Sequence, residues 1–457
     1  MFAPSTLGSL AAFKLGGEIQ HRHLPDWLRS RISPYLSGAR LRKAIAEVIR
    51  AEVPSWISTR PWRSLTQHRR ENVVENLKSG GDWGFRLSRN ENLHPYPSTF
   101  VHAIPASLIN ALGLRAGLIL DPFGGTGQTA SEAIKYECRV ISADSNTIAT
   151  LVARVRLTAL SAQQQGRIRD ISADDLKATR PADPPEFEER EKWYHPRTLT
   201  ELCRIWHFIQ SVVDTRIRQF LTVCFSATIP ATTGRRGKEH GFFADNTPLP
   251  TGLKQPPYVN AIELFLARIG RNLQILARSY GFLERTGKDP EKELARARVL
   301  QLNACDASPE DYGVQPGSID GIITSPPYLC MADYTLGQRL SYHWIAPTAL
   351  QSDFKKEIGA RRQRFRPGEA AENYFASIGQ FARSAANLLR SGGFLATVLG
   401  SPVAESFKNM RVIERIDKIF HAAGFELLWD QTRLIHWHRK QGYQRVRNER
   451  VSVHVRR

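Results

Sequence analysis

The clearest pattern along the chain is a series of short apolar runs, rich in branched residues and bounded by glycine or acidic residues. Such runs predict strands, and the run at 118–120 predicts a buried parallel strand. They lie at residues 118–120, 140–143, 299–302, 319–323, 394–399, 425–429 and 451–455. Apolar residues at helical spacing predict helices over 103–112, 374–389 and 412–423. This alternation predicts an α/β fold with a doubly wound, mostly parallel sheet.

Two stretches interrupt the alternation. Residues 21–80 have a helical and basic pattern, in which tryptophans are interspersed among arginines. Residues 151–298 lack clear strands and contain helical spacing near 199–209 and 261–280. We therefore expect a basic helical N-terminal extension, the first part of an α/β domain, a largely helical insertion and the second part of the α/β domain, at residues 1–90, 91–150, 151–298 and 299–457.

Composition adds a class of partner to this picture. Lys and Arg number 63 against 44 Asp and Glu, and the net charge of +19 favours a polyanion such as nucleic acid. The hydrophobic share of 42% is that of a folded globular protein. The 5 cysteines are far apart, which argues against a disulfide framework or a zinc site, and no apolar run is long enough to span a membrane. We expect a soluble cytoplasmic protein that needs no metal.

The first candidate site is a glycine-rich turn between the run at 118–120 and the helix that follows. We call it the glycine loop, and it consists of Asp121, Pro122, Phe123, Gly124, Gly125, Thr126 and Gly127. Glycines at such a turn let a ligand approach the backbone, and Asp144, after the next strand, can bind ribose hydroxyls. The spacing differs from the dinucleotide fingerprint GxGxxG, and no lysine follows as in a Walker-type phosphate loop. A glycine turn without a ligand is the alternative.

The second candidate site directly follows the run at 319–323. We call it the proline loop, and it consists of Thr324, Ser325, Pro326, Pro327 and Tyr328. Two prolines fix the backbone and remove two donors, which leaves a rigid array of acceptors beside an aromatic ring. This array suits a planar base with an exocyclic amine: carbonyl and hydroxyl oxygens accept the amine hydrogens while the tyrosine stacks on the ring. A proline-rich loop packed by a tyrosine is the structural alternative.

Together, the two loops resemble the cofactor and catalytic loops of the S-adenosylmethionine-dependent amino methyltransferases that modify DNA. Residues 94–100, with Tyr96, are similar to the segment that this family places over the methionine end of the cofactor, and Asp306 matches its acidic position near the adenine. The likeness covers about residues 94–146 and 299–455. It implies a Rossmann-like methyltransferase fold with S-adenosyl-L-methionine bound by Tyr96, the glycine loop, Asp144 and Asp306.

The resemblance also implies a reaction. Serine before Pro-Pro-Tyr is associated in this family with methylation of the cytosine amine at N4, so Ser325 predicts a site-specific cytosine-N4 DNA methyltransferase. The amine of an extruded base would attack the methyl group directly, without a covalent enzyme intermediate. The carbon-5 cytosine enzymes need a Pro-Cys nucleophile, whereas Cys330 follows Leu329 and is expected to be a buried small residue.

Basic segments are the candidates for contact with double-stranded DNA. Arg361, Arg362, Arg364 and Arg366 follow the proline loop, and we expect them to contact phosphates. Arg235, Arg236 and Lys238 lie on a polar loop of the insertion, which is the candidate region for target recognition. The N-terminal basic helices are the alternative for that role.

Other interpretations stay open. The glycine loop precedes the proline loop, whereas many cytosine-N4 enzymes have the reverse order, so adenine N6 remains a target. An amine in RNA is another target. A third hypothesis is a nucleic-acid-binding subunit with a degenerate methyltransferase fold, although both loops are intact here. An active enzyme could be the protecting half of a restriction-modification system, with a cognate restriction endonuclease as its partner.

Overall fold

The structure is a computed structural model that describes residues 66–80, 83, 85, 92–97, 100–188, 190–233, 256–400, 402, 407, 409–434 and 448–457. Most of the predicted N-terminal extension therefore lies outside the described residues, as do Arg235, Arg236 and Lys238 of the insertion. No helix of the described part is both long and apolar enough to cross a membrane.

The core of the fold is a sheet of 7 strands in the order β3-β2-β1-β4-β5-β7-β6. Neighbours from β3 to β5 are parallel, while β7 is antiparallel to both β5 and β6. The strands are β1 (Leu118–Asp121), β2 (Arg139–Asp144), β3 (Ala297–Gln301), β4 (Ile319–Thr324), β5 (Leu389–Gly400), β6 (Phe425–Leu434) and β7 (Asn448–Arg456). The predicted α/β class and the doubly wound, mostly parallel, Rossmann-like sheet are confirmed.

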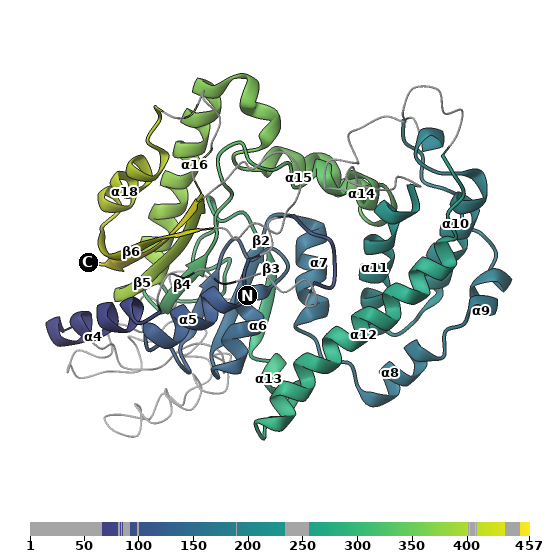
Figure 1. The fold of residues 1–457 in the computed structure, drawn as a ribbon, viewed down its shortest axis with the longest axis horizontal. Helices are drawn as coiled ribbons and strands as arrows, with labels where there is room; N and C mark the ends of the chain where they lie inside the picture. The colour runs from purple at the N-terminus through teal and green to yellow at the C-terminus, as the bar shows by residue number, and fades with distance from the viewer. Residues whose placement is uncertain are drawn as a thin grey trace, which may run out of the picture.

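Helices cover both faces of this sheet (Figure 1). Alternate residues of β1 belong to two different apolar clusters: Ile119 packs with one, and Leu118 and Leu120 with the other. This is the burial expected of a strand in the middle of a doubly wound sheet. The helices of this part are α5 (Ala103–Ala111), α6 (Gln128–Lys135), α7 (Thr147–Arg156), α16 (Pro367–Leu388) and α18 (Val412–Ala422).

One predicted boundary differs from the structure. The sequence predicts a helix over 374–389 and a strand over 394–399, but β5 already begins at Leu389 and passes through Gly392 and Gly393. Gly392 has φ +67, and a Cβ on Gly393 would approach the Arg390 carbonyl to 2.8 Å. The two glycines therefore form an irregular strand entry rather than a separate turn, and the pairing with β4 shifts register there.

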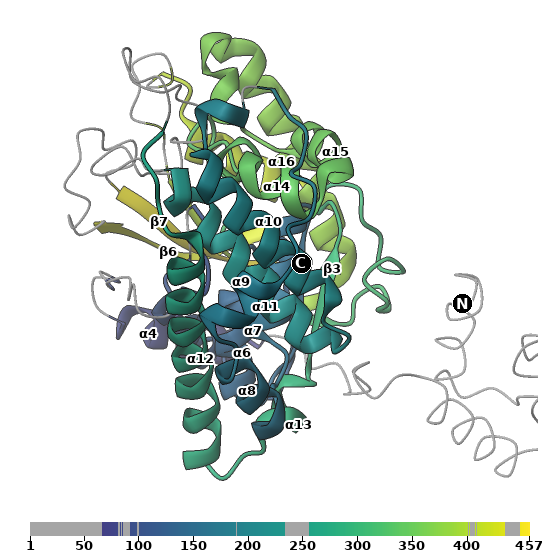
Figure 2. The ribbon, with the colours of Figure 1, turned by 90° about the vertical axis from the view of Figure 1, so that its right-hand side faces the viewer.

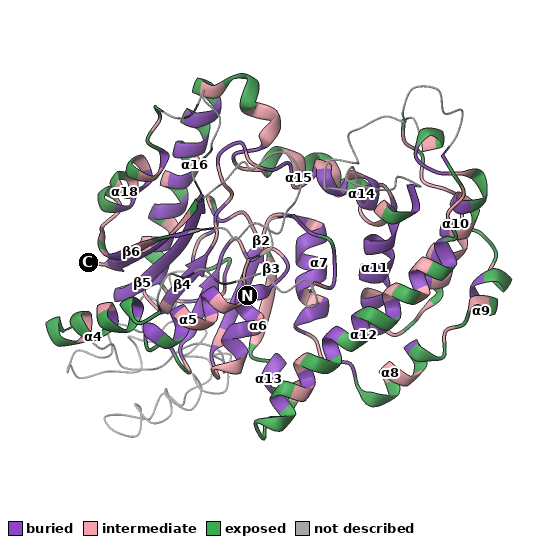
Figure 3. Cartoon of the chain, in the orientation of Figure 1, coloured by how far each residue is buried: buried purple, intermediate pink, exposed green. Residues whose placement is uncertain are grey.

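In its described residues, the stretch predicted as an insertion consists of helices joined by irregular segments, up to β3, which begins at Ala297. This helical region lies beside the sheet, at the right in Figure 1. In Figure 2, α12 runs upright at the left of the region. Helix α11 packs against α7 and α12, which joins the region to the core. Its helices are α8 (Ala162–Arg169), α9 (Ala173–Ala178), α10 (Pro196–Ser211), α11 (Thr215–Thr228), α12 (Ala261–Arg285) and α13 (Pro290–Leu294). The burial colours in Figure 3 show buried residues along α7 and α11 and exposed residues on α8 and α9.

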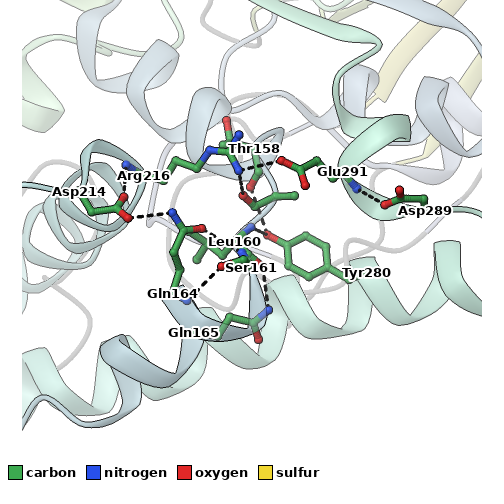
Figure 4. Close-up of polar contacts among 11 residues, drawn as sticks. Thr158, Leu160, Ser161, Gln164, Gln165, Asp214, Arg216, Tyr280, Asp289 and Glu291 are labelled. Atoms are coloured by element: carbon green, nitrogen blue, oxygen red, sulfur yellow. Dashed lines mark hydrogen bonds and ion pairs between the residues drawn. The ribbon is translucent and has the colours of Figure 1, made fainter.

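Figure 4 shows the polar contacts that connect these helices. Tyr280 on α12 accepts a hydrogen bond from Leu160 N (3.1 Å) and donates to Thr158 O (3.2 Å). Ser161 and Gln164 form a reciprocal capping box at the start of α8. The capping box satisfies backbone groups at the start of α8, and the Tyr280 hydroxyl satisfies backbone groups of the segment between α7 and α8.

Two further helical segments pack around the sheet. Helix α4 (Gln67–Lys78) lies in the predicted N-terminal extension and packs on β6, where Arg70 makes a bidentate ion pair with Glu426 (3.0 and 3.2 Å). Helices α14 (Arg339–Ile345) and α15 (Leu350–Lys356) lie between the sheet and the helical region, along the top in Figure 1.

Candidate functional site

The two predicted loops meet at one edge of the sheet. Strands β1 and β4 are parallel neighbours, so the glycine loop and the proline loop leave the sheet side by side. Thr324 Oγ1 donates a hydrogen bond of 2.6 Å to Asp121 Oδ1, and both side chains are buried. This edge, at the carboxyl ends of parallel strands, is where ligands bind in open α/β sheets.

The glycine loop is fixed to the end of β2. Gly124 N donates to Ala143 O (2.8 Å), and Gly125 N donates to Asp144 Oδ2 (2.9 Å). A side chain at Gly124 would collide with Ser142 Oγ, whereas the position of a Cβ on Gly125 opens onto free space. Gly125 also has φ +51, which favours glycine. The loop therefore presents bare backbone to whatever occupies the space above it.

An open cavity lies above this edge of the sheet, at the carboxyl ends of the parallel strands. Residues of the glycine loop, the proline loop and the segment around Tyr96 all contribute to its wall. Those predicted from the sequence are Tyr96, Asp121, Pro122, Phe123, Gly124, Gly125, Thr126, Asp144, Ser325 and Pro327. The structure thus brings most of the predicted cofactor residues and part of the proline loop to one cavity.

Two carboxylates in the cavity wall, those of Asp121 and Asp144, have raised pKa values. Burial raises the pKa of Asp121 to about 6, although the hydrogen bond from Thr324 opposes the rise. Burial likewise raises the pKa of Asp144 to about 6, against hydrogen bonds from the backbone of Asn146 and Gly125. Two desolvated carboxylates in one cavity favour a ligand that carries positive charge and hydroxyl groups.

The segment before α5 forms another wall. Tyr96 stacks on Tyr334, with ring centroids 6.1 Å apart and an interplanar angle of 21°. Two residues earlier, the buried His94 Nε2 lies 2.8 Å from Ser226 Oγ on α11. Burial lowers the pKa of His94 to about 3, so this imidazole is neutral at physiological pH. The predicted segment is thus anchored on the helical region as well as on the cavity.

The proline loop continues into a chain of side chains that ends on β7. Ser325 Oγ donates to Val398 O (3.2 Å) and lies 3.4 Å from Tyr328 Oη. Tyr328 Oη donates in turn to Glu449 Oε1 (3.0 Å). Burial and the neighbouring Glu449 hold the pKa of Tyr328 well above its usual value. Because the Ser325 proton is used inside the protein, its lone pairs can accept hydrogen bonds from the cavity side.

Several predicted residues do not line the cavity. The wall does not include Thr324, Pro326, Tyr328 or Gly127. Asp306 lies in a separate shallow depression and accepts a hydrogen bond from Asn303, which itself lines the cavity. Asp306 can therefore act on a cavity ligand only through Asn303.

The structure adds wall residues that the sequence analysis missed. Asp353 on α15 is 2% exposed and accepts hydrogen bonds from Thr147 N (2.8 Å) and Tyr342 Oη (2.6 Å). No motif marks it, and only folding brings α15 to the start of α7. Asn146 is different, because an Asn before a predicted helix is a recognisable N-cap. The other added wall residues are Gln128, Ser145, Asn303, Ala304, Tyr334, Thr335, Lys356, Glu357 and Ile358.

The predicted DNA-contacting arginines divide into two groups. Arg362 is paired inside the protein with Glu357 (2.7 Å) and Asp333 (3.3 Å), so its guanidinium is already used for structure. Arg364 and Arg366 are exposed beside it, Arg366 with an exposed ion pair to Glu369 (3.5 Å), and Arg361 is half-buried. All belong to or follow the short 3₁₀ turn η9 (Arg361–Phe365).

Cys330 is buried, as predicted, and burial raises the pKa of its thiol to about 11. Within the residues that the structure describes, no group of three or more His, Cys, Asp or Glu side chains could hold a metal ion.

Methyltransferases are among the known proteins to which this chain is similar. No family model matches the chain. The chain is 22% identical over 240 residues to the type II methyltransferase M.MvaI of Kocuria varians, a match that covers 50% of this chain and spans only half, 50%, of that protein.

Solved structures that match include a TehB-like SAM-dependent methyltransferase from Corynebacterium glutamicum and TrmN from Thermus thermophilus. The first is 9% identical, with a TM-score of 0.29, and the match covers 86% of this chain and 100% of that one. The second is 12% identical, with a TM-score of 0.29, and the match covers 98% of this chain and 77% of that one.

Proposed function

We propose that this protein transfers a methyl group from S-adenosyl-L-methionine to the N4 amine of cytosine in double-stranded DNA. The observation that carries the proposal is the hydrogen bond between Thr324 and Asp121, which joins the two predicted loops at one cavity. The similarity to a type II methyltransferase over half of the chain supports the same class of reaction.

The residues of the cavity fit this cofactor. The bare backbone of Gly124 and Gly125 admits a ligand closely, and Asp144 can accept hydrogen bonds from ribose hydroxyls. The buried Asp121 carboxylate suits a cationic amino group. When bound, S-adenosylmethionine would supply an electrophilic methyl group.

The proline loop supplies the acceptor for the target amine. Ser325 lines the cavity with its own proton donated to Val398 O, so its oxygen can accept an amine hydrogen. Accepting that hydrogen directs the nitrogen lone pair away from Ser325 and fixes the orientation of the base. Tyr328 and Glu449 hold the Ser325 hydroxyl in place from behind.

The DNA would lie over the surface next to the proline loop. Arg364 and Arg366 are exposed there and can neutralise phosphates, with Lys355 in support. Arg361 contributes from a half-buried position. Arg235, Arg236 and Lys238 of the helical region stay candidates for target recognition, and Arg362 serves to position the turn.

Mass spectrometry of nucleosides tests this function. Plasmid DNA is incubated with the protein and S-adenosylmethionine that carries a labelled methyl group, and the nucleosides are then separated. We expect label in N4-methylcytosine, and its loss in Ser325→Ala. Binding of S-adenosylmethionine by this variant should stay within about twofold of wild type, because one hydroxyl on the base side is removed.

The other outcomes are distinct. Label in N6-methyladenine would contradict the target assigned from Ser325 and leave the site intact. Label only in RNA would contradict DNA as substrate. A protein that does not bind S-adenosylmethionine at all would support the hypothesis of a degenerate binding subunit.

A further inference from the structure

We infer that Phe365 is the side chain that enters the DNA stack when the target base is extruded, an inference that rests on the proposed function. Phe365 is 77% exposed, the most exposed aromatic side chain among the large hydrophobic residues of the described part. Water-exposed phenylalanine on a folded surface suggests an apolar partner, and bases are the apolar part of a polyanion.

The charges around Phe365 are complementary to DNA. The Arg364 guanidinium lies over its ring, 4.1 Å from the centroid, and Arg366 follows with 81% of its side chain exposed. Arginines beside an exposed ring give an electrostatic contact with phosphates and leave the ring to stack on bases. The net charge of +19 also favours a polyanion over a protein as the partner of this ring and its arginines.

The turn that carries Phe365 is tied to the proline loop. Cys330 N donates to Gly359 O (2.8 Å), and Arg361 N donates to Ala332 O (3.0 Å). The segment directly after Tyr328 is therefore hydrogen-bonded to the start of the turn. Phe365 is accordingly held close to the loop that receives the extruded base.

The base of the turn is rigid. Arg362 is bound by Glu357, by Asp333 and by Phe354 O (2.7 Å), and its guanidinium also stacks on the Phe354 ring at 3.7 Å. Ala360 is fully buried. A rigid support lowers the entropy lost when an exposed side chain binds, which suits a wedge between bases.

The experiment compares two duplexes. The target site is first located by labelling plasmid DNA with wild-type protein, and a duplex containing it is made in two forms. In one form the target base is paired, and in the other the base opposite it is missing. The missing base removes most of the cost of extrusion, so a wedge is needed only for the paired form.

We expect Phe365→Ala to lower the methylation rate of the paired duplex by about tenfold or more, and that of the other duplex by less than about threefold. Phe365→Trp should keep the paired rate. Phe282→Ala is the matched control, since Phe282 is also exposed (38%) and lies near a cation, Lys135, but sits on α12. We expect this control to leave both rates unchanged.

Three results would overturn the inference. A Phe365→Ala variant as active as wild type on the paired duplex excludes the wedge. An equal loss on both duplexes assigns Phe365 to general binding, and thermal melting of the variant excludes misfolding as its cause. A wild-type protein that binds S-adenosylmethionine but labels no DNA contradicts the proposed function itself, and this appears before any variant is made.

Discussion

The cavity edge of the sheet and the start of α8 in the helical region are held together in different ways. At the cavity, buried side chains join residues that are 203 and 206 positions apart, in the pairs Thr324–Asp121 and Thr147–Asp353. At the start of α8, by contrast, Ser161 and Gln164 are 3 positions apart and exposed.

This contrast teaches where polar groups serve function. Exposed capping contacts satisfy helix ends and stabilise by about 1 kcal/mol each. Buried carboxylates at the cavity raise the cost of folding, and Asp121 and Asp144 are both pushed to a pKa of about 6 by desolvation. Burying a charged group is unfavourable, and such groups are typical of sites where a ligand of opposite charge binds them. We therefore expect substitutions in the two regions to act on different measurements.

The largest effect is expected for Asp121→Ala. It removes a buried carboxylate that contacts the cavity and leaves Thr324 Oγ1 without its acceptor. Affinity for S-adenosylmethionine, measured by isothermal titration calorimetry, should fall by about 100-fold, as expected for a hydrogen bond to a charged group. We expect the melting temperature of the Asp121→Ala variant to stay close to that of wild type. An unchanged affinity would contradict the assignment of Asp121 to the cofactor.

A matched pair of tyrosines compares the regions directly. Tyr328→Phe removes the hydroxyl that links Ser325 to Glu449, and the rate of methyl transfer should fall by about tenfold. Tyr280→Phe removes a hydroxyl with two hydrogen bonds in the helical region, and should lower the free energy of unfolding by about 1 kcal/mol. Tyr280→Phe should keep the transfer rate of wild type. Equal effects of both variants on the transfer rate would contradict the expected difference between the cavity and the helical region.

The pH dependence of cofactor affinity is the next test. Because Asp121 and Asp144 have a pKa of about 6, they take up protons as the pH falls through 6 and attract a cationic ligand less. Affinity for S-adenosylmethionine should fall by about tenfold from pH 7 to pH 5. Without ligand, their raised pKa makes these groups destabilise the fold as the pH rises from about 4 to 6. An affinity independent of pH in this window would contradict the assignment.

The smallest effect is expected for Ser161→Ala. It removes one half of the capping box of α8 and should lower the free energy of unfolding by about 1 kcal/mol, measured by denaturant titration. Cofactor affinity and transfer rate should match those of wild type. A loss of affinity here would indicate that the helical region and the cavity are coupled.

The sequence by itself determined the approximate positions of the strands along the chain and the residues of the glycine loop. Short apolar runs, turn glycines and helix caps act over neighbouring residues, so their effect can be predicted without the fold. The predicted start of this strand at residue 394 is wrong, because β5 already begins at Leu389 and includes Gly392 and Gly393.

Only the tertiary structure decided what faces the cavity. Asp353 and Lys356 carry no local pattern, and α15 reaches the cavity because Asp353 binds Thr147 N and Tyr342 Oη. Arg362 belongs to a run of similar arginines, yet its partners Asp333 and Glu357 distinguish it from Arg364. Burial and ion pairing depend on contacts between distant residues, and a single sequence contains no direct signal for them.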